Sequence, residues 1–180
     1  MWIYINNVFG DLQTYEDKLC NYLQEINLLG DISLSEDVMS NLVNLFKELI
    51  SNETLEGLHK YPCTLSLFLV WEGILKYDGD YWKNVAQDLG QDENENKWMN
   101  FIGDVFLQCL SSNGLPEFEN LGTKYVTPIL IHGYICDKDV PNFFEKFLVP
   151  FYHHYSIDKK SVSYQLKTWR KESERHNELK

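Results

Sequence analysis

His132 and Cys136 are the pair in this sequence whose types and spacing most resemble a metal site. A separation of four residues places both side chains on one face of a helix, where an imidazole and a thiolate can share one ion. Zinc needs three or four ligands, however, and no second pair in the sequence has a matching spacing. Asp137 and Asp139 lie close by, but Asp139 is better explained as a helix N-cap. We therefore predict a core histidine beside a small thiol, and no metal site.

A group of carboxylates and a pair of histidines are the next candidates for chemistry. The carboxylates are those of Asp78, Asp80, Asp92, Glu93 and Glu95. General acid–base catalysis needs acids brought together in a semi-buried pocket, whereas these residues lie in turn and loop contexts where capping and solvation account for them. His153 and His154 are adjacent, point in different directions on a helix and make a poor chelate. Both groups are predicted to be structural.

The motifs that mark common enzyme classes are missing from the sequence. It contains no GxxxxGK[ST] phosphate loop, GxGxxG, HExxH, GxSxG or EF-hand loop. No local signature pairs one of the cysteines with a histidine as a nucleophile and its base. The sequence thus favours a protein with no catalytic residues and no cofactor, and an enzyme whose site is assembled from distant residues stays the alternative.

The four cysteines stand far apart, at positions 20, 63, 109 and 136, and form no CxxC motif. This spacing favours reduced, buried thiols over disulfides or a zinc site. The N-terminal residues MWIYINNVFGD lack the basic and apolar segments of a signal peptide, and no apolar run approaches ~18 residues. The cytoplasm is therefore the expected location, with no membrane association.

The last segment of the chain carries the feature that most favours a function. Basic and aromatic side chains fall near one another by helical spacing, and they form the predicted binding surface: Tyr164, Lys167, Trp169, Arg170, Lys171 and Arg175. Such a surface can contact phosphate or an acidic protein face. The alternative is a solvated helix with internal ion pairs, because Glu172, Glu174 and Glu178 lie among the bases. The helical pattern runs to the last residue without a cap, which predicts a longer parent protein or a partner helix.

Apolar residues recur at three- and four-residue intervals along most of the chain, which predicts an all-α fold. We expect one compact domain of about eight short helices, with a short strand or irregular cap at the N-terminus. Asp11 and Ser35 are expected N-caps, and Gly30, Gly90 and Gly114 expected helix ends. The segment CTLSLFLVWEGILKY is apolar nearly all round, which predicts a central helix buried by its neighbours.

Charge is unevenly spread along the chain. Residues 1–122 carry 20 acidic and six basic residues, a net charge of −14, and residues 123–180 carry seven acidic and ten basic residues, a net charge of +3. An acidic body argues against non-specific nucleic-acid binding over most of the surface. We accordingly describe residues 1–157 as an acidic helical body and 158–180 as a basic C-terminal helix that packs on it or projects from it.

Several short patterns give the stretch from Tyr61 to Phe147 a family likeness. They are YDGDYW, a tryptophan that opens a helix, GLPEF, KYVTPILIHG and VPNFF. This half of the chain resembles a helical region of large, poorly characterised bacterial proteins, some of them carried by mobile or phage-defence islands. The resemblance implies no catalytic residues. WEGILKYDGDYWKNVA also resembles a tetratricopeptide repeat, but the pattern does not recur at ~34 residues, so a repeat array is not expected.

These observations favour a non-enzymatic helical protein-interaction module. Its expected role is that of a subunit or regulatory domain in a bacterial antiviral defence or mobile-element system. The expected partner is a protein, either a larger complex or a second copy bound through the C-terminal helix. Nucleic-acid binding by the basic C-terminal helix is the alternative function.

Overall fold

The computed structural model describes residues 3–76, 81–92, 96–118 and 125–134, all of which belong to one compact unit, Met1–Lys138. The described chain is all-α apart from one short sheet, as the sequence predicts. In chain order its elements are β1 (Ile3–Ile5), α1 (Leu12–Leu23), the 3₁₀ turn η1 (Leu29–Asp31), β2 (Ile32–Leu34), α2 (Glu36–Glu53), the 3₁₀ turn η2 (Leu55–Lys60), α3 (Pro62–Lys76), α4 (Tyr81–Leu89), α5 (Asn96–Asn113) and α6 (Val126–Tyr134).

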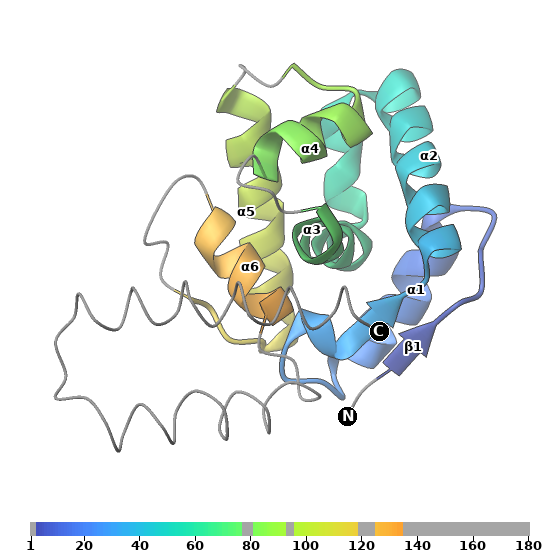
Figure 1. Cartoon of the computed structure of the whole chain (residues 1–180). Coiled ribbons are helices and arrows are strands. Elements are labelled where there is room, and N and C mark those ends of the chain that lie inside the picture. The colour runs from blue at the N-terminus through green and yellow to red at the C-terminus, as the bar shows by residue number, and fades with distance from the viewer. Residues whose placement is uncertain (1–2, 77–80, 93–95, 119–124, 135–180) are drawn as a thin grey trace, which may run out of the picture. The chain divides into compact units, whose positions relative to one another are not determined.

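The helix α3 lies at the centre of the described fold, as its all-round apolar sequence predicts. Eleven consecutive residues of this helix, Cys63 to Gly73, are buried. Figure 1 looks nearly along α3 and shows the other helices arranged around it, and α1, α4, α5 and α6 all contact it. A helix that is apolar on every side is stable only where neighbours cover every side. The surrounding helices therefore take their positions from α3.

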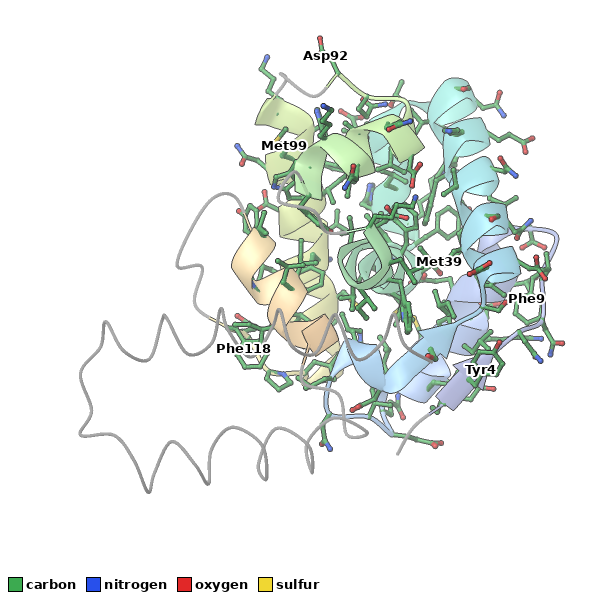
Figure 2. The ribbon with its side chains drawn as sticks, viewed as in Figure 1. Tyr4, Phe9, Met39, Asp92, Met99 and Phe118 are labelled. Atoms are coloured by element: carbon green, nitrogen blue, oxygen red, sulfur yellow. A yellow bond between two sulfur atoms is a disulfide. The ribbon has the colours of Figure 1, made fainter. Side chains whose placement is uncertain are left out.

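The surrounding helices present their apolar stripes to this centre. Large side chains from α1, α2, α3 and α5 are fully buried, among them Tyr15, Phe46, Phe68 and Phe106. Phe46 and Phe68 meet edge to face, with ring centroids 5.3 Å apart. Figure 2 shows the side chains that fill the space around α3. This aromatic contact helps to fix how α2 packs on α3.

Most helix ends follow the predicted signals. The Asp11 carboxylate accepts a hydrogen bond from the Thr14 backbone N–H at 2.8 Å and begins α1, and Ser35 Oγ accepts one from the Val38 N–H at 3.3 Å and begins α2. Gly90 and Gly114 follow α4 and α5 with positive φ angles of 67° and 64°. Glycine is favoured at such positions because it adopts the left-handed conformation without steric cost.

The first helix ends earlier than predicted, and a short sheet follows. The sequence predicts that α1 continues through Ile26 to Gly30, but it stops at Leu23, and Gly30 lies inside η1. The N-terminal strand is confirmed as β1, and its parallel partner β2 is an unpredicted element with Ile3 opposite Ile32. All three residues of β2 are buried, so this strand lacks the alternation by which a half-buried strand is recognised.

No helix in the described part of the chain is both long and apolar enough to cross a lipid bilayer. The longest described helices, α2 and α5, have 18 residues each, and polar side chains punctuate both of them.

The turn η1 packs directly against the backbone of α6. A Cβ atom added at Gly30 would lie 2.6 Å from the carbonyl oxygen of His132, closer than Cβ atoms approach any heavy atom in real structures. At Gly10 the same added atom would meet nothing within 4 Å. Gly30 is therefore required by the close approach of two backbones and not by its own dihedral angles.

We expect the Gly30→Ala variant to be less stable than the wild-type protein by about 1–3 kcal/mol, because η1 and α6 must separate to admit the methyl group. The Gly10→Ala variant is the matched control and should change the free energy of unfolding by less than about 0.5 kcal/mol. Urea denaturation of the three proteins measures both effects. Equal stability of the two variants would contradict the close packing of η1 on α6.

Candidate functional site

The N-terminus of α3 is buried, and a carboxylate from α1 satisfies its free backbone N–H groups. Glu16 Oε1 accepts a hydrogen bond from the Cys63 N–H at 2.8 Å. Glu16 Oε2 accepts hydrogen bonds from the Thr64 N–H at 2.8 Å and from Thr64 Oγ1 at 2.7 Å. Pro62, the first residue of the helix, has no N–H, and the Leu65 N–H already bonds to the Tyr61 carbonyl at 2.9 Å. Every donor in the first turn is therefore accounted for.

The Glu16 side chain is itself buried, with 7% of its surface exposed. Burial raises the pKa of this carboxyl, and the hydrogen bonds from Thr64 and Cys63 act in the opposite direction. The positive end of the α3 dipole also favours a negative charge at this point. Glu16 thus connects α1 to α3 through its hydrogen bond with Cys63, a residue 47 positions away in the sequence.

A disulfide joins the same two helices beside Glu16, and it corrects the prediction of reduced thiols at these positions. Cys20 of α1 is bonded to Cys63 of α3, with their Cα atoms 5.7 Å apart. Cys20 Sγ also lies 3.3 Å from Glu16 Oε1. The sequence could not show the pairing, because the two cysteines are 43 residues apart and only the packing of α1 on α3 brings them together.

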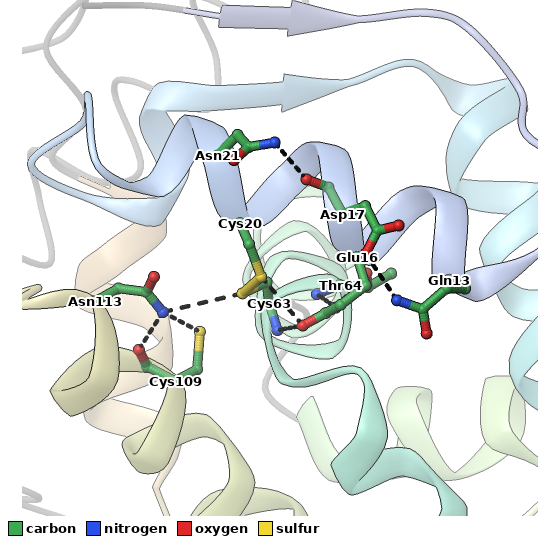
Figure 3. Close-up of a disulfide and its surroundings, with 9 residues drawn as sticks. All are labelled: Gln13, Glu16, Asp17, Cys20, Asn21, Cys63, Thr64, Cys109 and Asn113. Carbon is green, nitrogen blue, oxygen red and sulfur yellow. Dashed lines mark hydrogen bonds between the residues drawn. A yellow bond between two sulfur atoms is a disulfide. The ribbon is translucent and has the colours of Figure 1, made fainter.

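A third sulfur, that of Cys109 on α5, is linked to the disulfide through the side chain of Asn113 (Figure 3). The Asn113 Nδ2 atom is 3.8 Å from Cys109 Sγ and 3.9 Å from Cys63 Sγ, and it donates to the Cys109 carbonyl at 2.8 Å. Cys109 is a free, buried cysteine, as the sequence predicts. Burial raises the pKa of its thiol to about 11, so the sulfur is protonated and unreactive at neutral pH.

His132 is the buried histidine that the sequence predicts, and it links three parts of the chain. Its Nδ1 accepts a hydrogen bond from the Leu29 N–H at 3.2 Å, and its Nε2 lies 2.9 Å from the Pro116 carbonyl oxygen, to which it donates. The ring packs edge to face against Phe106 and Phe118. Burial lowers the pKa of His132 to about 4, so the ring is neutral at physiological pH. Both nitrogens are used in holding η1 and the segment after α5 to α6.

A second buried carboxylate, Glu72, lies near the C-terminal end of α3. Lys76 Nζ is 3.1 Å from Glu72 Oε1 and also pairs with Asp88 of α4. Burial raises the pKa of Glu72 to about 7, with Asp88 raising it further and Lys76 opposing the shift. The Tyr81 hydroxyl donates to the Leu69 carbonyl at 2.9 Å, and burial together with the charge of Glu72 raises its pKa. Two carboxylates thus share one lysine at the junction of α3 and α4.

Most of the residues that the sequence singles out lie outside the described part of the chain. This holds for the predicted binding surface, Tyr164, Lys167, Trp169, Arg170, Lys171 and Arg175, and for Cys136, His153, His154 and the cap Asp139. Of the five loop acids only Asp92 is described, and its backbone carbonyl accepts a hydrogen bond from Trp98 Nε1 at 2.8 Å. The boundary between an acidic body and a basic helix at residue 158 also lies outside.

Glu16 and Glu72 are the two chemically notable residues that sequence reasoning missed, although the sequence carries a signal for each. Glu16 falls on the stripe of Leu12, Leu19 and Leu23, the positions that α1 buries. Glu72 stands within the apolar run of α3. A carboxylate at a position that the helical period assigns to the core has to find a partner there, so both residues could have been selected as buried acids.

Comparison of the chain with protein-family models, with curated proteins and with solved structures finds no match. A buried carboxylate, Glu16, and a disulfide lie together at the N-terminus of α3, and Cys20, one half of that disulfide, is partly exposed.

The disulfide should contribute about 2–4 kcal/mol to the free energy of unfolding, since it closes a loop between residues 43 positions apart. We expect urea denaturation to show this difference between oxidised and reduced protein, and the Cys20→Ser variant to show no dependence on reductant. The Cys109→Ser variant is the control, because it should keep the full difference between the two redox states. Equal stability of the oxidised and reduced wild-type protein would contradict the cross-link.

Glu72 should make stability depend on pH near neutrality. Its pKa is raised in the folded state, from the ordinary 4.5 to about 7, so the folded protein binds more protons than the unfolded chain between these values. The free energy of unfolding therefore falls as pH rises through this window, by roughly 1–3 kcal/mol in total.

The Glu72→Gln variant removes this titration, and its curve of stability against pH should be flatter than that of the wild type between pH 5 and about 7.5. Glu48, an exposed residue of α2, provides the matched control as Glu48→Gln, whose curve should follow the wild type. Chemical denaturation at a series of pH values measures the three curves. A wild-type curve parallel to that of Glu72→Gln would rule out a titrating Glu72.

Proposed function

We propose that this chain is a non-enzymatic helical module that binds a protein partner. The proposal includes a role as a subunit or regulatory domain of a bacterial antiviral defence or mobile-element system, which follows from the resemblance of residues 61–147. Its supporting observation is a complementarity of charge. The described residues expose eleven acidic side chains against six lysines, whereas residues 123–180 carry a net charge of +3.

Two buried polar residues of the described fold, Glu16 and His132, support this proposal, because their hydrogen bonds hold separate elements together. Glu16 accepts three hydrogen bonds at the start of α3, and both nitrogens of His132 are bonded to backbone groups. Groups engaged in this way stabilise one arrangement of helices. A rigid body of helices is suited to presenting a fixed surface to a partner.

The partner in this proposal offers acidic groups to residues 158–180, which the sequence predicts to form a basic helix. A second copy of the chain is one candidate source of acidic groups, because acidic side chains outnumber lysines on its described surface. A larger protein of the same system with an acidic surface is the other source. Association of either kind relies on opposite charges, so it should weaken as salt screens them.

We expect the purified chain to associate, either with itself or with a protein that co-purifies with it and rebinds after both are purified. Light scattering and calorimetric titration should show affinity falling by roughly tenfold or more between low salt and about 1 M salt. The double variant Arg170→Glu with Lys171→Glu should lose the association. Lys47→Glu, an exposed change on α2, is the control and should keep it.

A chain that stays monomeric at low salt and rebinds no purified protein would contradict this function. Nucleic-acid binding by the same basic helix is the second candidate, favoured by the alternation of Tyr164 and Trp169 with basic residues. A gel shift at low salt that the Arg170→Glu, Lys171→Glu variant abolishes would favour it. The absence of a shift even at low salt would exclude it.

A further inference from the structure

The side chains of Glu16, Cys20 and Cys63 bring three metal-ligand atoms together at the start of α3. A carboxylate oxygen and the two sulfurs all lie within 4.8 Å of one another. We propose that these three residues form a zinc site when the disulfide between Cys20 and Cys63 is reduced. This inference concerns α1 and α3 alone and is independent of the proposed partner of the C-terminal helix.

The distances fit tetrahedral zinc after a small change. With Zn–S bonds of about 2.3 Å and a Zn–O bond of about 2.0 Å, two sulfurs in such a site lie about 3.8 Å apart, and each sulfur lies about 3.5 Å from the oxygen. Cys20 Sγ already lies 3.3 Å from Glu16 Oε1. Reduction breaks the bond between the two sulfurs and leaves them free to separate to this distance. With Cα atoms only 5.7 Å apart, side-chain rotation can supply this movement.

The carboxylate of Glu16 is already oriented to act as a metal ligand. Three hydrogen bonds from Cys63 and Thr64 hold it in place, and Oε1 accepts just one of them. A carboxylate oxygen has two lone pairs, so Oε1 can bind a metal ion without releasing the N-terminus of α3. Hydrogen bonds of this kind fix the direction of a ligand and strengthen metal binding.

The negative charge of the reduced site favours the binding of a cation. Reduction places two thiols beside a buried carboxylate, and the α3 N-terminus favours the thiolate of Cys63. Two thiolates and a carboxylate carry three negative charges, which a divalent ion largely neutralises. Thiolates select Zn²⁺ over Mg²⁺ or Ca²⁺, which prefer oxygen ligands. Cys20 is partly exposed, so water can reach the ion and fill its fourth position.

The chemistry of loading requires a reductant from outside the chain, and a dithiol is the class that fits. The dithiol gives two electrons and two protons to the Cys20–Cys63 bond, becomes a disulfide itself and leaves two thiols behind. Zn²⁺ then replaces the two thiol protons, which pass to solvent. A disulfide oxidant reverses the sequence: it takes two electrons from the two sulfurs and two protons from solvent, becomes a dithiol, and leaves the Cys20–Cys63 bond and a released zinc ion. Zinc binding and the disulfide therefore exclude one another.

Binding of Co²⁺ tests the proposed zinc site, because Co²⁺ occupies tetrahedral thiolate sites and gives a measurable absorption band there. We expect the full chain, reduced with a phosphine without oxygen, to bind one Co²⁺ with a thiolate-to-cobalt absorption band in the near ultraviolet. Added Zn²⁺ should displace the cobalt, and Mg²⁺ should not. Zn²⁺ should also raise the Tm of the reduced protein and leave that of the oxidised protein unchanged, because a ligand of the folded state stabilises it.

Variants separate this site from other thiols of the chain. Cys20→Ser and Cys63→Ser should abolish the band, and Glu16→Gln, which keeps a hydrogen-bond acceptor, should weaken binding by roughly tenfold or more while unfolding stays cooperative. Cys136→Ser is the control and should bind as the wild type does. The site would be disproved by a missing band in reduced, folded wild-type protein, by a Tm that Zn²⁺ does not raise, or by loss of binding in Cys136→Ser.

Discussion

The fold depends on burying the N-terminus of α3 without leaving its backbone N–H groups unpaired. A helix end inside a protein exposes donors that cost free energy unless an acceptor reaches them. Pro62 has no backbone N–H, and the Glu16 carboxylate accepts hydrogen bonds from the N–H groups of Cys63 and Thr64. The Tyr61 carbonyl accepts the next hydrogen bond, from the Leu65 N–H, which begins the regular helical pattern. Because the acceptor comes from α1, the first helix has one position and one rotation relative to the central helix, and the other helices then pack around this pair.

The Glu16 carboxylate and the disulfide both join α1 to α3, but they stabilise the protein in different ways. The hydrogen bonds of Glu16 act in the folded state, where they satisfy buried donors. The bond between Cys20 and Cys63 acts chiefly on the unfolded chain, whose freedom it reduces. The first link is independent of redox conditions and the second is not. The packing of α1 on α3 therefore relies on the hydrogen bonds of Glu16, which do not depend on redox conditions, and on the disulfide, which does. The proposed zinc site uses residues of both links.

Local patterns predicted the helices, while contacts between distant residues remained hidden. The all-round apolar run of α3, the caps Asp11 and Ser35 and the stops Gly90 and Gly114 are local signals, and the structure confirms them. The disulfide and β2 depend on residues that only the finished fold brings together, so no spacing revealed them. Gly30 shows the same limit of local sequence patterns. A glycine is needed there because the backbone of α6 lies so close, and not because a helix ends there as the sequence predicts.

The two ends of α3 show why a buried carboxylate is informative only with its surroundings. Glu16 and Glu72 are both glutamates at core positions, and burial raises the pKa of both. At the N-terminal end, helix donors and the dipole favour the charged form, so Glu16 is suited to structural and ligand roles. Glu72 shares Lys76 with a second carboxylate, Asp88, so one cation serves two negative charges. The same residue type thus forms a constant link at one end of the helix and a group that titrates near neutral pH at the other.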